Sequence, residues 1–393
     1  MTADLQELFD RAGRNPPASA SALDPGVVVR RAVRRSRARR ITAAVAAAVM
    51  LAVGVGVVSH RQESAPPQPA TPPHASLGRL AFGLDGSIYL ADWDGENPVR
   101  IAGGVANGVP QCGEYRGEGP MWSPDGRYLA FRGEVPAAAG PCQGTVIIAD
   151  AAGRRVASFP GEGWKVAWSP DSSRVATWLD EGRTIGVYGL DGTRQAVLTL
   201  PPGLMAPGDF DPAWSPDGRS LLVPHGVLVP VNGSTPRLLP MDDPRTQWHP
   251  AFSLDGAHVA YVGQDGALVV TAADGSHART LVPFGVENFV WSRAGDRIAF
   301  ETPTGAGTTD MGPASELHVV DVASGRLTLL DGTGGPDTLG VIGFSPEGDR
   351  ILFSATDAQN VSTLWTVRAD GTGAHALAPV TDWGDWQAVA APR

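Results

Sequence analysis

The chain has 393 residues, of which 42% are hydrophobic and 18% are charged, and this composition excludes both a chain that is disordered throughout and a membrane protein with many spans. The 49 glycines and 34 prolines favour short strands joined by turns over a bundle of helices. Two cysteines exclude a disulfide-dense scaffold and a multi-cysteine metal cluster.

The net charge of −10 is divided unevenly along the chain. Residues 1–40 contain nine arginines and four acidic residues, a balance of +5, so the remainder carries −15. Because nucleic-acid binding requires a basic surface, we expect no nucleic-acid partner for the larger part of the chain. Cationic or neutral partners fit its charge better.

The first 40 residues form a basic tail that ends in a block of arginines between Arg30 and Arg40. Residues 41–60 carry no charged side chain, and at ~1.5 Å per residue a helix over them would cross a hydrocarbon core of about 30 Å. We therefore predict a single-pass transmembrane helix with a cytoplasmic N-terminus and an extracytoplasmic remainder. A cleaved signal peptide is the alternative.

Residues 61–77 contain five prolines and few apolar side chains, which is typical of a semi-extended linker. From residue 78 to residue 393 we expect a single domain. Within it a unit that begins with Trp or Phe recurs at spacings of 46, 46, 38, 39 and 53 residues. The six units begin at Trp122, Trp168, Trp214, Phe252, Trp291 and Phe344. Periods of about 40–45 residues built from strands and turns are typical of propeller blades.

Each unit has a readable local structure. In the first, Trp122 ends a strand, Ser-Pro-Asp-Gly turns the chain, and Leu129 and Phe131 lie on one face of the next strand. Aspartate recurs in these turns, where its carboxylate can accept backbone hydrogen bonds, and we interpret it as structural. The turn aspartates in question are Asp125, Asp171, Asp217 and Asp255.

The two ends of the repeat region predict the number of blades. Leu80 and Phe82 occupy second-strand positions with no aromatic unit before them, whereas Trp386 opens a first strand with nothing after it. If residues 385–390 pair with residues 78–84, one composite blade closes the ring and removes both exposed edges. We therefore predict an all-β, seven-bladed β-propeller, with six blades as the alternative.

The turn WSPDG followed by an apolar strand resembles the TolB-like family of β-propeller repeats, which are similar in form to WD repeats. The units at Phe252 and Trp291, which read FSLDG and WSRAG, depart from the pattern. The resemblance implies a propeller, and it implies a binding protein, a scaffold or the non-catalytic half of a peptidase. The tail, arginine block and span also resemble actinobacterial single-pass membrane proteins.

The sequence offers no catalytic motif. It contains no G-x-S-x-G nucleophile elbow and no H-E-x-x-H metal motif, so we predict no catalytic residue, no cofactor and no metal site. The positions four residues before each aromatic do not repeat, and we expect them at the mouth of the channel, where acids and aromatics would suit a protein or peptide partner. These candidate residues are Glu118, Trp164, Phe210, Trp248, Glu287, Gly340 and Asp382.

Cys112 and Cys142 follow the predicted span, in a compartment where disulfides persist. Blade order places both in loops at the same end of one blade, so we expect a disulfide between them, with two free thiols as the alternative.

Taken together, these features predict a membrane-anchored, extracytoplasmic propeller that acts as a non-catalytic binding or sensing module. Two alternatives stay open: a transmembrane signalling partner whose cytoplasmic tail binds a regulator such as a sigma factor, and a propeller enzyme of the lactonase or lyase type.

Overall fold

The structure is a computed structural model. The described residues, to which every structural statement below refers, are 78–103, 119–135, 143–161, 166–180, 182–200, 212–241, 248–263, 266–283, 285–309, 312–330, 338–380 and 384–387. The predicted tail, span and linker lie outside them. Within these ranges, none of the elements is a helix long and apolar enough to cross a membrane.

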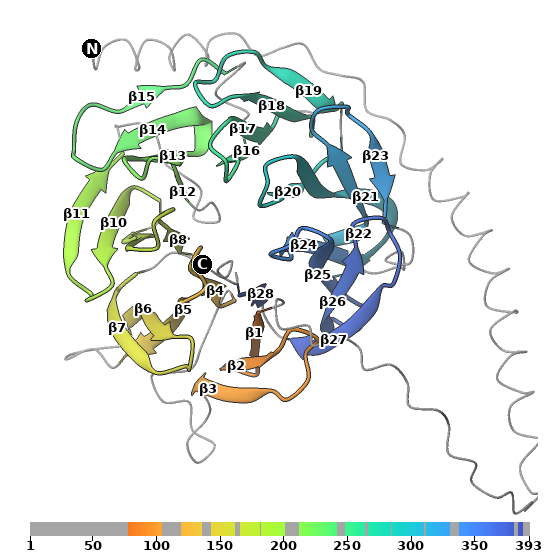
Figure 1. Ribbon diagram of the computed structural model, residues 1–393, viewed down its shortest axis with the longest axis horizontal. Helices are drawn as coiled ribbons and strands as arrows, with labels where there is room; N and C mark the ends of the chain where they lie inside the picture. The colour runs from red at the N-terminus through yellow and green to blue at the C-terminus, as the bar shows by residue number, and fades with distance from the viewer. Residues whose placement is uncertain are drawn as a thin grey trace, which may run out of the picture. The chain divides into compact units, whose positions relative to one another are not determined.

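Seven antiparallel sheets of four strands each are arranged as blades around a central channel (Figure 1). Blade 1 contains β28 (Gly384–Trp386), β1 (Arg79–Leu84), β2 (Ser87–Asp92) and β3 (Val99–Gly103). Blade 2 contains β4 (Met121–Trp122), β5 (Tyr128–Val135), β6 (Gln143–Asp150) and β7 (Arg155–Pro160). Blade 3 contains β8 (Ala167–Trp168), β9 (Arg174–Trp178), β10 (Thr184–Gly189) and β11 (Arg194–Thr199). Blade 4 contains β12 (Ala213–Trp214), β13 (Ser220–Val223), the 3-10 turn η1 (Pro224–Gly226), β14 (Val227–Pro230) and β15 (Arg237–Leu238).

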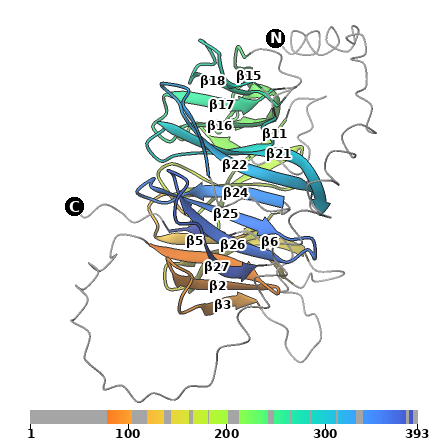
Figure 2. The same cartoon turned by 90° about the vertical axis from the view of Figure 1, so that its right-hand side faces the viewer.

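The remaining three blades repeat this pattern. Blade 5 contains β16 (Trp248–Phe252), β17 (His258–Val262), β18 (Leu268–Ala272) and β19 (Arg279–Val282). Blade 6 contains β20 (Asn288–Trp291), β21 (Arg297–Thr309), β22 (Gly312–Asp321) and β23 (Leu327–Leu329). Blade 7 contains β24 (Thr338–Phe344), β25 (Arg350–Thr356), β26 (Ser362–Arg368) and β27 (His375–Val380). The first strand of each blade lies nearest the channel and the fourth lies at the perimeter, and Figure 2 shows the ring from the side.

Blade 1 is assembled from both ends of the repeat region. Strand β28 pairs antiparallel with β1, with Leu80 opposite Trp386 and Phe82 opposite Gly384. The prediction of a composite closing blade and of seven blades is therefore confirmed, and the six-blade alternative is wrong. The described closing strand is Gly384–Trp386, and residues 388–390 of the predicted strand lie outside the described residues.

In blades 2 to 7, the turn after the innermost strand is held by a serine and an aspartate. In blade 4, Ser215 Oγ donates to Asp217 Oδ1 at 2.6 Å, and the backbone N–H of Arg219 donates to the same oxygen at 3.0 Å. These hydrogen bonds favour the ionised carboxylate and lower the pKa of Asp217. The same serine–aspartate contact occurs at Asp125, Asp171 and Asp255, so the structural interpretation of these aspartates is confirmed.

Six blades carry such a turn, and we call the side of the ring that bears these turns the turn face. The opposite side, where the chain enters each innermost strand, is called the entrance face. Because the strands of a blade are antiparallel, the turn between its third and fourth strands also lies on the turn face.

Neighbouring blades are held together by apolar packing and by repeated polar contacts. Trp168 of blade 3 packs in one cluster with Ala130 and Ile148 of blade 2, and its Nε1 donates to the carbonyl oxygen of Met121 at 3.1 Å. At the next seam, Trp214 Nε1 donates to the carbonyl of Ala167 at 2.9 Å. The repeated tryptophan thus fills the space between blades and also satisfies a backbone carbonyl.

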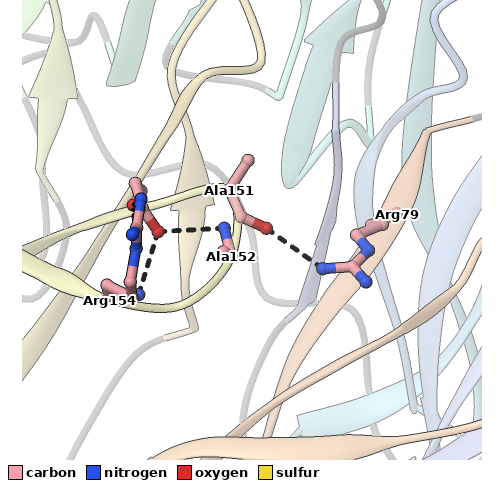
Figure 3. A network of polar contacts seen from close by, with 5 residues as sticks. Arg79, Ala151, Ala152 and Arg154 are labelled. Carbon is pink, nitrogen blue, oxygen red and sulfur yellow. Dashed lines mark hydrogen bonds and ion pairs between the residues drawn. The ribbon is translucent and has the colours of Figure 1, made fainter.

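A second kind of contact joins the blades farther from the channel. Arg79 of β1 donates to the carbonyl of Ala151 in blade 2 at 3.0 Å, as Figure 3 shows. The turn that carries this carbonyl is fixed by Asp150, which accepts the N–H groups of Ala152 and Arg154. Gly153 in this turn has φ +81°, and a Cβ there would lie 2.5 Å from Ile101 of blade 1, so only glycine lets the two blades approach this closely.

Candidate functional site at the central channel

The residue immediately before each innermost aromatic is half-buried in every blade. Six of these positions hold apolar residues or glycine and one holds an acid. In order from blade 2 to blade 1 they are Met121, Ala167, Ala213, Ala251, Val290, Gly343 and Asp385. Asp385 therefore brings the single ionisable side chain to this ring of positions.

Asp385 lies on the closing strand β28 and faces blade 2. Its Oδ2 accepts the backbone N–H of Trp122 at 2.8 Å. Burial raises the pKa of Asp385 from 3.8 to about 7, although the N–H groups of Trp122 and Trp386 that it accepts act in the opposite direction. Among the described residues, the ion pairs Arg154–Asp150, Arg297–Asp296 and His318–Glu316 do not involve Asp385. A carboxyl in this environment is a candidate partner for a cationic group.

Arg293 crosses the channel at the turn face. It belongs to the first turn of blade 6, and its Nη2 donates to the carbonyl of Pro124, in the first turn of blade 2, at 3.3 Å. Blades 2 and 6 are separated by blades 7 and 1 on the shorter path around the ring. A side chain that joins their innermost turns must therefore span the end of the channel.

Glu287 lies on the opposite side of the ring, at the entrance face. Its side chain is exposed, and its backbone N–H donates to the carbonyl of Glu301 at 3.2 Å. Glu301 is buried on β21 and its Oε2 accepts the N–H of Val341 on β24 at 2.8 Å, so the segment that carries Glu287 is attached to a seam between blades 6 and 7.

The structure describes only part of the predicted channel mouth. Glu287 is exposed at the entrance face, and Gly340 is half-buried within β24. Trp248 begins β16, where its backbone pairs with Val262, and its side chain lies outside the described residues. The other predicted mouth residues, and both cysteines, also lie outside: Glu118, Trp164, Phe210, Asp382, Cys112 and Cys142.

Two channel residues, Asp385 and Arg293, were missed by the sequence analysis, although each left a signal. Asp385 is an acid at a position that holds an apolar residue or glycine in the other six units. Arg293 stands where four of the units have proline, in the departing turn WSRAG. Deviation from the repeat, rather than the repeat itself, marked both residues.

Within the described ranges, no group of three or more His, Cys, Asp or Glu side chains is arranged to hold a metal ion. The aspartates of the turns are engaged by neighbouring serines and backbone N–H groups, as at Asp217.

No family model matches the sequence, and no curated protein matches it. Solved structures do match. An oligogalacturonate lyase in complex with manganese is 14% identical with a TM-score of 0.51, over 77% of this chain and 86% of that chain. TolB from Acinetobacter baumannii is 18% identical with a TM-score of 0.47, over 79% of this chain and 82% of that chain.

A third match is the β-propeller domain of Cps50 (Swd1) from Myceliophteria thermophila, which is 15% identical with a TM-score of 0.46, over 66% of this chain and 83% of that chain. At these identities the similarity concerns the fold alone. By its own strand topology the chain is a seven-bladed β-propeller.

Proposed function

We propose that this chain is a membrane-anchored, extracytoplasmic β-propeller that acts as a non-catalytic binding or sensing module and takes a cationic segment of a protein or peptide at the entrance face of its channel. Arg293 carries this proposal, because its contact with Pro124 spans the turn-face end of the channel. A partner that reaches Asp385 along the channel must then approach from the entrance face.

The chemistry of the channel supports a cationic partner. Asp385 is the one acid in a ring of positions that otherwise hold apolar residues or glycine, and Glu287 is an exposed acid at the entrance face. The chain beyond residue 40 carries a net charge of −15, which would attract a basic segment over a distance of about one Debye length, roughly 8 Å at physiological salt. A rigid ring that presents variable loops is also how propellers acquire binding surfaces.

Site-specific crosslinking in cells tests the proposed face. A photoreactive residue at position 287 should capture a partner, whereas the same residue at Glu347, an exposed acid on the turn face, should not. In the chain that carries the photoreactive residue at position 287, replacing Trp164, Trp248 and Asp382 together should remove that crosslinked product and leave the circular dichroism spectrum unchanged. Equal capture from positions 287 and 347 would contradict the proposed face.

The proposed placement in the membrane is tested by reporter fusion. Alkaline phosphatase joined after residue 393 should be active, because the arginine block holds the N-terminus in the cytoplasm and residues 41–60 carry the rest across. Deleting residues 41–60 should abolish that activity while the fusion is still synthesised. Activity that survives the deletion would refute the anchor.

A further inference from the structure

A crevice lies on the turn face at the seam between blade 7 and blade 1. Its lining residues are Gly78, Trp93, Ser345, Pro346, Arg350 and Trp386. The empty volume between the lining residues, including the part open to solvent, is about 200 Å³. The lining residues lie too close together to admit a water molecule. It lies apart from the entrance face, where the proposed partner binds.

At two other seams, an arginine six residues after the innermost aromatic joins its blade to the next. Arg174 Nη2 donates to the carbonyl of Gly218 at 2.8 Å, and its guanidinium lies 4.7 Å from the centre of the Trp214 ring. Arg297 Nη2 donates to the carbonyl of Gly348 at 2.7 Å, and its guanidinium lies 5.7 Å from the centre of the Phe344 ring. In both cases the acceptor is the glycine of the next blade's first turn.

Arg350 occupies the same position in blade 7, but the acceptor is missing. The next blade is the composite one, in which β28 and β1 come from opposite ends of the propeller, so no Ser-Pro-Asp-Gly turn connects them. Arg350 Nη1 is buried and has no hydrogen-bond partner. The guanidinium lies 5.6 Å from the centre of the Trp93 ring instead.

The walls of the crevice are aromatic and hold the arginine in place. Trp386 Nε1 donates to the carbonyl of Trp93 at 3.2 Å, which ties the two indole-bearing residues together. The backbone of Arg350 is fixed by its N–H bond to Ser345 Oγ at 3.1 Å. The lining contains no acidic side chain, so the positive charge of Arg350 is not neutralised there.

We propose that this crevice binds the carboxylate of a small planar organic acid, with Arg350 as its cationic partner and Trp93 and Trp386 beside its apolar body. The carboxylate would supply the oxygen that a turn glycine supplies at the other seams, and its two oxygens match the fork of the guanidinium. Because the crevice is narrow, a flat ring fits better than a bulky body. Binding would require the side chain of Trp93, which is half-buried on a turn, to move away from the other lining residues.

Calorimetric titration of the full chain with sodium benzoate tests the proposal, with benzamide as the neutral analogue and sodium chloride at matched ionic strength as the salt control. We expect saturable benzoate binding and none for benzamide or chloride. Arg350→Met should weaken benzoate binding at least tenfold. Arg297→Met removes the corresponding arginine at the seam between blades 6 and 7, where the turn glycine Gly348 is present as acceptor. This variant should bind benzoate with an affinity within twofold of the unsubstituted chain.

Arg350→Lys keeps the positive charge but removes the two parallel N–H donors of the guanidinium. It replaces Arg350→Met in the test if circular dichroism shows that Arg350→Met does not fold. It should bind benzoate at least fivefold more weakly than the unsubstituted chain. The proposal is overturned if benzoate shows no saturable binding up to about 50 mM, a range that covers weak carboxylate sites. Equal binding of benzamide, or undiminished benzoate affinity in the folded arginine variants, overturns it as well.

Discussion

The repeated tryptophan shows how one residue type serves two roles. Its ring packs between blades, and in Trp168, Trp214 and Trp291 the indole N–H donates to the carbonyl of the residue before the preceding blade's aromatic. Trp122 is as deeply buried, yet its Nε1 has no acceptor. Blade 1, the composite blade, precedes the blade of Trp122, and the hydrogen bond from the indole N–H is not formed at this seam.

This difference predicts unequal effects of the same substitution. Trp168→Phe should lower the free energy of unfolding by about 1 kcal/mol more than Trp122→Phe, because only the first removes an inter-blade hydrogen bond while both lose similar ring volume. Chemical denaturation of the two variants measures the difference. If Trp122→Phe is the more destabilising of the two, the indole N–H is not the source of the stabilisation.

Asp385 predicts a second effect at the residue scale, in the pH dependence of stability. Its folded pKa of about 7 lies above its ordinary value of 3.8, so the folded protein holds the proton more tightly than the unfolded chain does. The stabilisation is complete below pH 4 and is lost as the pH rises through 7. Between pH 5 and pH 8.5 it should fall by about 2–3 kcal/mol, at 1.36 kcal/mol per pH unit.

Asp385→Asn removes this titration while keeping an oxygen that can accept the N–H of Trp122. The difference in unfolding free energy between the variant and the unsubstituted chain should therefore shift in favour of the variant as the pH rises from 5 to 8.5. Asp217→Asn is the matched control, because hydrogen bonds lower the pKa of Asp217 and its stabilising contribution is lost on acidification instead. A pH-independent difference for Asp385→Asn would contradict the assignment.

The short strand β28 closes the ring by pairing with β1. Gln387, which follows it, accepts the N–H of Arg79 through Oε1 and donates its own backbone N–H to the carbonyl of Arg79 at 2.8 Å. Its Nε2 donates to the carbonyl of Gly126 in blade 2 at 2.6 Å. The residue thus ties β28 to β1 and to the next blade, and it contacts the turn glycine as arginine does at other seams.

Deleting residues 383–393 should open blade 1. The deletion removes the buried ring of Trp386, the pairing with β1 and the contacts of Gln387, so we expect a loss of about 3–5 kcal/mol in unfolding free energy. Deleting residues 388–393 keeps all of these groups and is the control. Thermal unfolding of both chains measures the effect, and equal midpoints would refute closure by β28.

The two cysteines give a prediction for loops that lie outside the described residues. A bond between Cys112 and Cys142 would close a loop of about 30 residues and stabilise the domain by ~3–4 kcal/mol in the chain-entropy model. Thiol titration of the denatured, unreduced protein should find no reactive thiol. Two reactive thiols per chain would show that the bond does not form.

At the scale of the whole molecule, closing the ring from two distant parts of the chain makes one blade unlike the other six. The composite blade has no first turn, so Arg350 lacks the glycine carbonyl that accepts at two other seams. Trp122, which packs beside the same blade, also has no acceptor for its Nε1. The same blade carries Asp385, which accepts the N–H of Trp122, and Gln387, which donates to the turn glycine Gly126 where arginine donates at two other seams. The non-repeating chemistry of the molecule is therefore concentrated where the repeat is interrupted.

The sequence alone determined the repeat, its strands and its turns, and it favoured seven blades over six. Aromatic, turn and apolar positions recur at fixed offsets because each blade satisfies the same local rules of strand pairing and turn geometry, and these are written in neighbouring residues. The unmatched Leu80 and Trp386 even predicted the composite blade, since an open edge would be left unpaired.

Only the tertiary structure decided which deviating residues meet. Arg293 and Pro124 are 169 positions apart, and Asp385 lies 263 positions from Trp122, so no local pattern could pair them. The missing acceptor of Arg350 likewise appears only once blade 7 stands beside blade 1. Strand pairing and turn geometry specify a single blade. Ring closure decides which side chains face each other across the channel or a seam, because it places the two ends of the propeller side by side.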